Sequence, residues 1–158
     1  MGEIRTLYGT SNQAITITLN SLASAAARAG ASVSNTTNKF QDVLIQLIVR
    51  TAAGTVAAEK AVKVYAYGTA DGGTTYSDNT VGTDVAHTLT SPPNTVLIGI
   101  INVAVADTIY ESHPFSLATA FGGIVPDNWG IIVENQTGLA LNATGNSAFY
   151  QGIKTETV

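Results

Sequence analysis

The chain reads KAVKVYAYGT from Lys60 to Thr69, and this stretch decides the fold class. Apolar Val62, Val64 and Ala66 occupy every second position, and the positions between them hold Lys63, Tyr65 and Tyr67. A period of two places successive side chains on opposite faces of a strand, whereas a helix needs a spacing of three to four. The stretch therefore predicts a β-strand with one buried face.

Similar short apolar segments follow one another along the whole chain. Strands are also predicted at Ala14–Leu19, Asp42–Thr51, Thr95–Val105, Ile109–Leu117, Trp129–Asn135, Gly138–Asn142 and Ala148–Thr155, with Thr95–Val105 expected to be the most buried. The Ala-rich segment 21–29 predicts at most one or two helical turns, 52–58 is a turn, and 70–93 is a long surface loop. About eight short strands without a long helix predict an all-β protein with a single domain, a β-sandwich or jelly roll.

The domain organisation is simple. A length of 158 residues without internal repeats suits one domain, so we predict an N-terminal arm over 1–13 and a sandwich over 14–158. The arm carries three apolar side chains, Ile4, Leu7 and Tyr8. Two alternatives stay open: the arm reaches onto a partner, or it is a first strand in its own sheet.

Composition limits the function classes. Charged residues make up 11% of the chain, against about a quarter in typical soluble domains, and the mean hydropathy is +0.21. Such a neutral surface favours a homo-oligomer or permanent embedding in an assembly. The net charge of -4 and the scattered basic residues argue against nucleic acid as a partner, and no apolar run approaches the roughly 20 residues of a membrane helix.

One group of residues has the types needed for hydrolysis. Ser112 and His113 are neighbours, with Asp107 and Glu111 close by in sequence. Adjacent strand residues point to opposite faces, and the chain has no Gly-x-Ser-x-Gly motif. We therefore predict that the protein is not an enzyme.

Three aspartates suggest a metal-binding loop. Asp71, Asp78 and Asp84 carry the oxygen ligands that calcium prefers. Their spacing fits no EF-hand, and Asp-Gly-Gly at 71–73 is an ordinary turn former. The chain also has no cysteine for a thiolate site. We predict no metal and no cofactor.

The aromatic residues have two readings. Tyr65, Tyr67, Tyr76, Trp129 and Tyr150 have the flat rings that stack on sugars, and the same rings pack well in a core or under a partner subunit. Packing is preferred, because Tyr65 and Tyr67 share one face of a strand and Trp129 begins another strand after a turn.

A family resemblance joins several motifs. The succession SVSNTTNKFQD at 32–42, VYAYG at 64–68, DGGTTY at 71–76 and WGIIVENQTG at 129–138 resembles small virion proteins of tailed bacteriophages. These are similar to capsid decoration, or cement, proteins. The resemblance covers most of the chain from about Ser21 onward, and the N-terminal segment matches least.

The resemblance implies a jelly-roll-like homotrimer on the outside of an icosahedral phage head, made in the host bacterial cytoplasm, that clamps neighbouring major capsid subunits. We predict a virion structural protein with self and the major capsid protein as partners. A carbohydrate- or receptor-binding sandwich module of a virion is the alternative, and an enzyme with an unrecognised site is a third hypothesis. The predicted interface residues are Ile4, Leu7, Tyr8, Tyr65, Tyr67 and Trp129.

Overall fold

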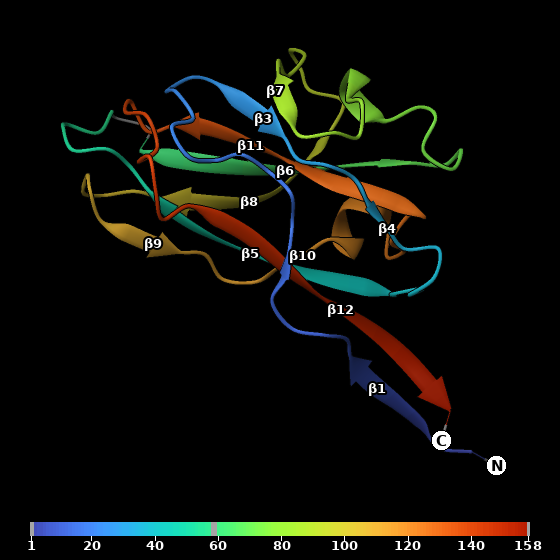
Figure 1. The fold of residues 1–158 in the computed structure, drawn as a ribbon. Helices are drawn as coiled ribbons and strands as arrows, with labels where there is room; N and C mark the ends of the chain where they lie inside the picture. Colours follow the sequence, from blue (N-terminus) through green and yellow to red (C-terminus); the bar gives the residue numbers. More distant parts are fainter. Residues whose placement is uncertain (1, 58–59, 158) are drawn as a thin grey trace.

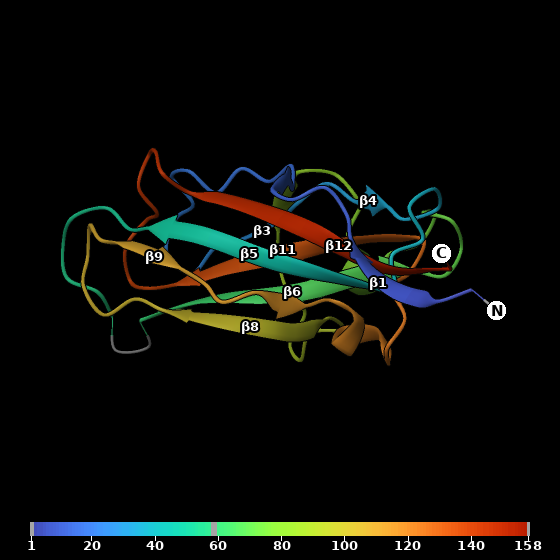
Figure 2. The same ribbon diagram turned by 90° about the horizontal axis from the view of Figure 1, so that it is seen from below.

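Two antiparallel sheets pack face to face (Figures 1 and 2). The computed structural model describes residues 2–57 and 60–157; Met1, Val158 and Ala58 of the predicted turn lie outside the described residues. Sheet A contains β1 (Ile4–Tyr8), β2 (Gln13–Ala14), β5 (Asp42–Arg50), β9 (Ile109–Glu111), β10 (Phe115–Ser116) and β12 (Ser147–Thr157). Sheet B contains β3 (Ala27–Ala29), β4 (Val33–Ser34), β6 (Ala61–Thr69), β7 (Val85–His87), β8 (Val96–Asn102) and β11 (Asn128–Gln136). The predicted all-β sandwich is confirmed.

The strand order is that of a jelly roll. If β1/β2, β3/β4 and β9/β10 each count as one interrupted strand, the first strand pairs with the last, the second with the seventh, the third with the sixth and the fourth with the fifth. This is the pairing of one long hairpin rolled up into two sheets. The remaining strand, β7, adds to the edge of sheet B beside β3.

The core lies between the sheets. In β5 the buried positions alternate with half-buried ones, and Val43, Ile45, Leu47 and Val49 have no exposed surface. Trp129 on β11 reaches the same core from sheet B and is also completely buried. Its indole ring meets the Tyr150 ring edge-on, with the centroids 5.3 Å apart. The apolar residues that alternate in the sequence thus form one packed layer between the two sheets.

The segment from 70 to 95 covers the outer face of sheet B. On that face Tyr65, Tyr67 and Ile132 form a second cluster, packed against Tyr76 and Leu89 of the covering segment. The segment contains β7 (Val85–His87) and two buried residues, Asp78 and Thr80, each less than a tenth exposed. The predicted surface loop is therefore largely a lid, with a short 3-10 turn η1 at Ser77–Asn79.

The expected burial of the segment 95–105 is wrong for β8. This strand is the edge of sheet B and pairs only with β6 among the described strands. Val96, Leu97 and Ile100 are each exposed by 44–45%. An apolar run shows that a strand has much apolar surface, but the sheet order decides whether that surface is covered.

Two smaller expectations also change. The Ala-rich segment forms turns and β3 rather than helical turns, because Ser21 and Ala25 take left-handed backbone angles and the Asn135 side chain binds the Leu22 carbonyl. Of the predicted strand Ala14–Leu19, only Ala14 belongs to a strand, β2, which pairs with β12. The predicted sides still hold along that segment, since Ile15 and Leu19 are buried. Among the described residues, no helix is long and apolar enough to cross a membrane.

Candidate interaction surfaces

The residues considered for hydrolysis do not come together. The Ser112 hydroxyl is buried and accepts a hydrogen bond from the Leu47 amide at 3.0 Å. The His113 ring is exposed and packs edge-on against Phe115. Asp107 pairs with Arg50 at 2.8 Å instead of with a histidine. This geometry offers no nucleophile and base within hydrogen-bond reach of each other.

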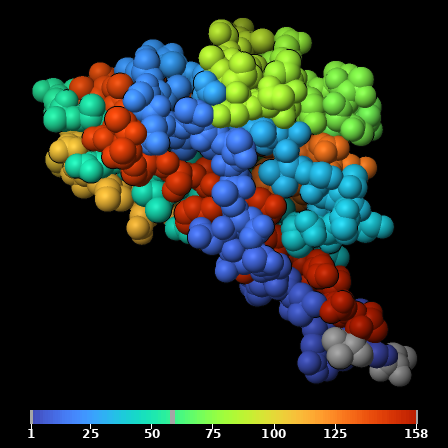
Figure 3. Space-filling view, viewed as in Figure 1, coloured from blue at the N-terminus to red at the C-terminus, as the bar shows by residue number. Residues whose placement is uncertain are grey.

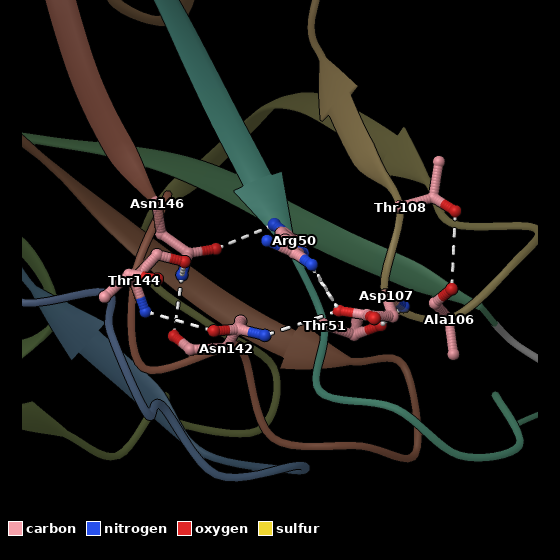
Figure 4. Close-up of polar contacts among 8 residues, drawn as sticks. All are labelled: Arg50, Thr51, Ala106, Asp107, Thr108, Asn142, Thr144 and Asn146. Carbon is pink, nitrogen blue, oxygen red and sulfur yellow. Dashed lines mark hydrogen bonds and ion pairs between the residues drawn. The ribbon is translucent and has the colours of Figure 1, made fainter.

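The Arg50–Asp107 pair belongs to a polar cluster at the end of the sandwich (Figure 4). Asn142 donates to the Asp107 carboxylate at 3.5 Å, the Asp107 amide donates to the Thr51 hydroxyl, and the Asn146 side chain accepts from the Arg50 amide. These bonds tie the loop after β8, the end of β5 and the loop before β12 to one another. The cluster holds loops in place, and its one carboxylate is neutralised by Arg50.

The three aspartates of the suspected metal loop serve different partners. Asp71 accepts hydrogen bonds from the Thr74 and Thr75 amides and closes a local turn. Asp84 accepts from Arg28 at 2.6 Å. Among the described residues, no group of three or more His, Cys, Asp and Glu side chains is placed to hold a metal ion.

Asp78 binds several parts of the lid over sheet B to one another. Its side chain has no exposed surface and accepts hydrogen bonds from the His87 ring, from the Thr90 amide and hydroxyl, and from the Asn94 amide. These donors come from β7 and from the loop that leads to β8. One buried carboxylate therefore fixes both ends of this loop.

Acid should loosen this lid. Burial on its own would raise the pKa of Asp78, but hydrogen bonds from Thr90, Asn94 and His87 outweigh it and lower the pKa to about 2. A carboxyl whose pKa is lowered in the folded protein stabilises the fold at pH values above its ordinary pKa of 3.8. This stabilisation is lost as the pH falls towards about 2.

We expect the melting temperature to fall between pH 4 and pH 2, and Asp78→Asn to reduce this fall. The fall should not vanish, because Asp71 and Asp84 also have lowered pKa values. Thermal melts across that pH range measure the effect, with exposed Asp127→Asn as the control. Identical pH profiles of the wild type and Asp78→Asn would contradict the role given to Asp78.

The aromatic rings form two separate pairs rather than one platform. Tyr67 and Tyr76 meet edge-on under the lid, and Trp129 and Tyr150 meet in the core on the other side of sheet B. Tyr67 donates a hydrogen bond to the Gly30 carbonyl, and burial raises its pKa. Tyr65 donates to Glu134, and burial with that carboxylate raises its pKa to about 12.

The six predicted interface residues thus fall into two sets. Tyr65, Tyr67 and Trp129 are 8%, 0% and 0% exposed, so a partner has almost no access to them in the closed sandwich. The other three all lie on β1. Ile4 is 73% exposed, Tyr8 is 63% exposed, and Leu7 is half-buried.

β1 and the end of β12 form a two-stranded ribbon that projects from the body (Figures 1 and 3). The ribbon pairs Ile4 with Thr157 and Tyr8 with Ile153, whereas β5 pairs with β12 only as far as Ile153. The described chain therefore begins and ends at the tip. The arm is a strand paired within its own sheet, and it also reaches beyond the sandwich.

The two faces of the ribbon differ in chemistry. Directly paired residues share a face in an antiparallel pair, and side chains alternate along each strand. One face therefore carries the uncharged residues Ile4, Thr6, Tyr8, Ile153, Thr155 and Thr157. The opposite face carries Arg5, Leu7, Lys154 and Glu156. β-Branched and aromatic side chains suit packing against another protein surface.

The uncharged face continues onto the outside of sheet A. In β5 the core residues alternate with the outward residues Leu44, Gln46 and Ile48, and β12 adds Phe149, Gln151 and Ile153 beside them. Figure 2 looks onto these strands from outside, with β5 and most of β12 towards the viewer. A hollow of about 340 Å³ lies there, lined in part by Leu44, Gln46 and Phe149. We call this surface the sheet A face.

Comparisons with known proteins add no relative to these observations. No protein-family model, no curated protein and no solved structure matches the chain. The function therefore has to be argued from the surfaces themselves.

The ribbon could not have been located from the sequence alone. The segment 1–13 carries apolar side chains, but its partner strand lies at the other end of the chain. The sheet A face did leave a signal. Leu44 and Ile48 stand at the outward positions of a strand whose inward positions are already apolar. Such a strand is covered on both sides in many proteins.

Proposed function

We propose that the chain is a virion structural protein, a decoration or cement protein that binds the outer surface of an icosahedral phage head. In this role it acts as a homotrimer and stabilises contacts between major capsid subunits. It has no catalytic role and requires no cofactor. Its place is the exterior of the capsid, after synthesis in the host bacterial cytoplasm.

The ribbon is the observation that carries the proposal. A two-stranded ribbon is marginally stable by itself in water, and this one has large apolar side chains exposed at both of its ends, Ile4 and Tyr8. It reaches past the body, so its uncharged face is positioned to pack on a neighbour. A rigid sandwich with such a projection suits a protein that bridges subunits.

Three further points support the same role. Jelly rolls are frequent in viral capsid proteins, although the fold alone does not fix a function. The low charge of the chain, 11%, suits a surface that is largely covered in an assembly. The resemblance of the turn and strand motifs to phage decoration proteins points the same way.

The alternative is a carbohydrate- or receptor-binding module of a virion. Jelly rolls also occur in lectins, and Tyr8 supplies an exposed ring. The buried state of Tyr67 and Trp129 weighs against a sugar platform built from the predicted aromatics. A glycan array separates the two functions, because a decoration protein should bind no glycan.

Light scattering and pelleting test the proposal together. The purified chain should have a mass of about 49 kDa, three times its 16.3 kDa. It should also pellet with particles built from the major capsid protein of the phage that encodes it. A stable monomer at micromolar concentration that stays in the supernatant would contradict the proposal.

A further inference from the structure

Two surfaces with apolar side chains face away from the core on different sides of the sandwich, one half-buried and one exposed. The first is the sheet A face. The second is the β8 edge, defined by Val96, Leu97 and Ile100. Figure 2 shows the sheet A strands towards the viewer and β8 along the margin. Leu97 and Ile100 pair with Tyr65 and Lys63, which point away from the core, so their side chains lie on the outside of sheet B.

We propose that the sheet A face of one copy packs on the β8 edge of a second copy. This proposal rests on the homo-oligomer part of the proposed function and names the surfaces that form the contact. It does not depend on the particle to which the oligomer binds.

Few charges lie on either surface: Asp42, Arg50 and Glu111 share the outward side of sheet A, and Lys63 lies beside Ile100. From Val85 to Ala106 the chain has no Lys, Arg, Asp or Glu. The outward positions of β12 from Ser147 to Thr157 are also uncharged. Natural edge strands are protected by lysine, proline or a covering segment, and β8 has neither residue within its bounds. Arg50 is paired with Asp107, and the other charges, Asp42 and Glu111 on one surface and Lys63 beside the other, have opposite signs.

The size of the sheet A face is in the range of protein–protein contacts. Nine residues of β5 and four strand positions span about 30 Å by 19 Å. The projected area is about 570 Å², against the roughly 800 Å² that each partner contributes to a standard stable interface.

A contact between two different surfaces would cover the sheet A face and the β8 edge at once. If the sheet A face packed on itself around a twofold axis, the β8 edge would stay bare. A face-to-edge contact covers both surfaces with one interface per copy. Contacts of this type close into a ring when the rotation between copies divides a full turn. A third of a turn gives the proposed trimer.

Two lysine variants and their mixture test this arrangement. Phe149→Lys places a charge in the sheet A face, and Ile100→Lys places one in the β8 edge. Each variant alone should dissociate to 16.3 kDa chains, with self-association weakened about 100-fold or more because an unpaired charge is buried. An equimolar mixture should form a one-to-one complex, because the intact face of Ile100→Lys meets the intact edge of Phe149→Lys.

Controls separate loss of the contact from loss of the fold. Val81→Lys replaces an apolar residue that is 63% exposed outside both surfaces, and it should keep the wild-type mass. Thermal melts check the fold of each variant. If Phe149→Lys unfolds, Ile48→Lys takes its place on the sheet A face, and Leu97→Lys likewise replaces Ile100→Lys on the β8 edge.

Three results would overturn the proposal. In the first, the wild type is a monomer, or both variants keep the wild-type mass, so that a capsid subunit or another partner covers these surfaces. In the second, Ile100→Lys still associates by itself, which means that the sheet A face packs on its own copy. In the third, the folded single variants dissociate but their mixture does not associate. Loss of particle binding with the mass pattern intact would count against the proposed function alone.

Discussion

The double substitution Ile4→Lys with Tyr8→Lys should weaken binding to capsid particles at least about 100-fold and leave the sandwich folded. Each large apolar side chain contributes about 1.5–3 kcal/mol when it is fully buried on a partner, and 1.4 kcal/mol corresponds to tenfold in affinity. Three ribbons per trimer would multiply the effect through avidity. Pelleting at increasing particle concentration measures the affinity, and thermal melts monitor the fold.

The matched control is Val81→Lys with Val85→Lys, which adds the same charge at exposed apolar positions away from the ribbon. This control should bind particles like the wild type. Deletion of residues 2–10 should behave like the ribbon variant and leave the melting temperature almost unchanged, since most of these residues are exposed. Equal binding by the ribbon variant and the control would show that the ribbon is not the contact. Unfolding of the deletion variant would place the ribbon in the core.

Trp129→Ala should lower the free energy of unfolding by about 3–5 kcal/mol. The side chain is the largest that is fully buried, and its removal leaves a cavity between the sheets beside Tyr150. A loss of this size is a large part of the free energy of unfolding of a typical domain, which is about 5–15 kcal/mol. Urea unfolding followed by fluorescence or circular dichroism gives the value.

Trp129→Phe should cost much less than the alanine variant. The indole N–H is buried without a hydrogen-bond partner among the described residues, so phenylalanine keeps most of the packing and loses no such bond. Comparable losses from both substitutions would mean that the indole N–H has a role that the core packing does not explain. A small loss from Trp129→Ala would place Trp129 outside the stabilising core.

The strands in the middle of each sheet were predictable from the sequence. Asp42–Thr51 and Lys60–Thr69 match β5 and β6 within one residue, and Trp129–Asn135 lies inside β11. These strands are flanked on both sides, so local alternation or apolar character and final burial agree. The number and spacing of the strands predicted a β-sandwich or a jelly roll.

The edges and the surfaces were not predictable in the same way. The exposure of β8 depends on which strand lies beside it, and the ribbon depends on pairing between the two ends of the chain. The lid over Tyr67 depends on Asp78, which reaches its donors across a loop. Each is a non-local arrangement, and a single-sequence pattern contains only local information.

An electron-microscopy reconstruction of the particles is the most direct test of the central claim that the chain acts by packing onto a capsid. We expect density for the jelly roll outside the shell, in groups of three, with the ribbon lying against a neighbouring subunit. Particles from a strain with the gene deleted should lack this density and break at lower temperature. Particles of wild-type composition that show no such density, with the protein free in the lysate, would contradict the account.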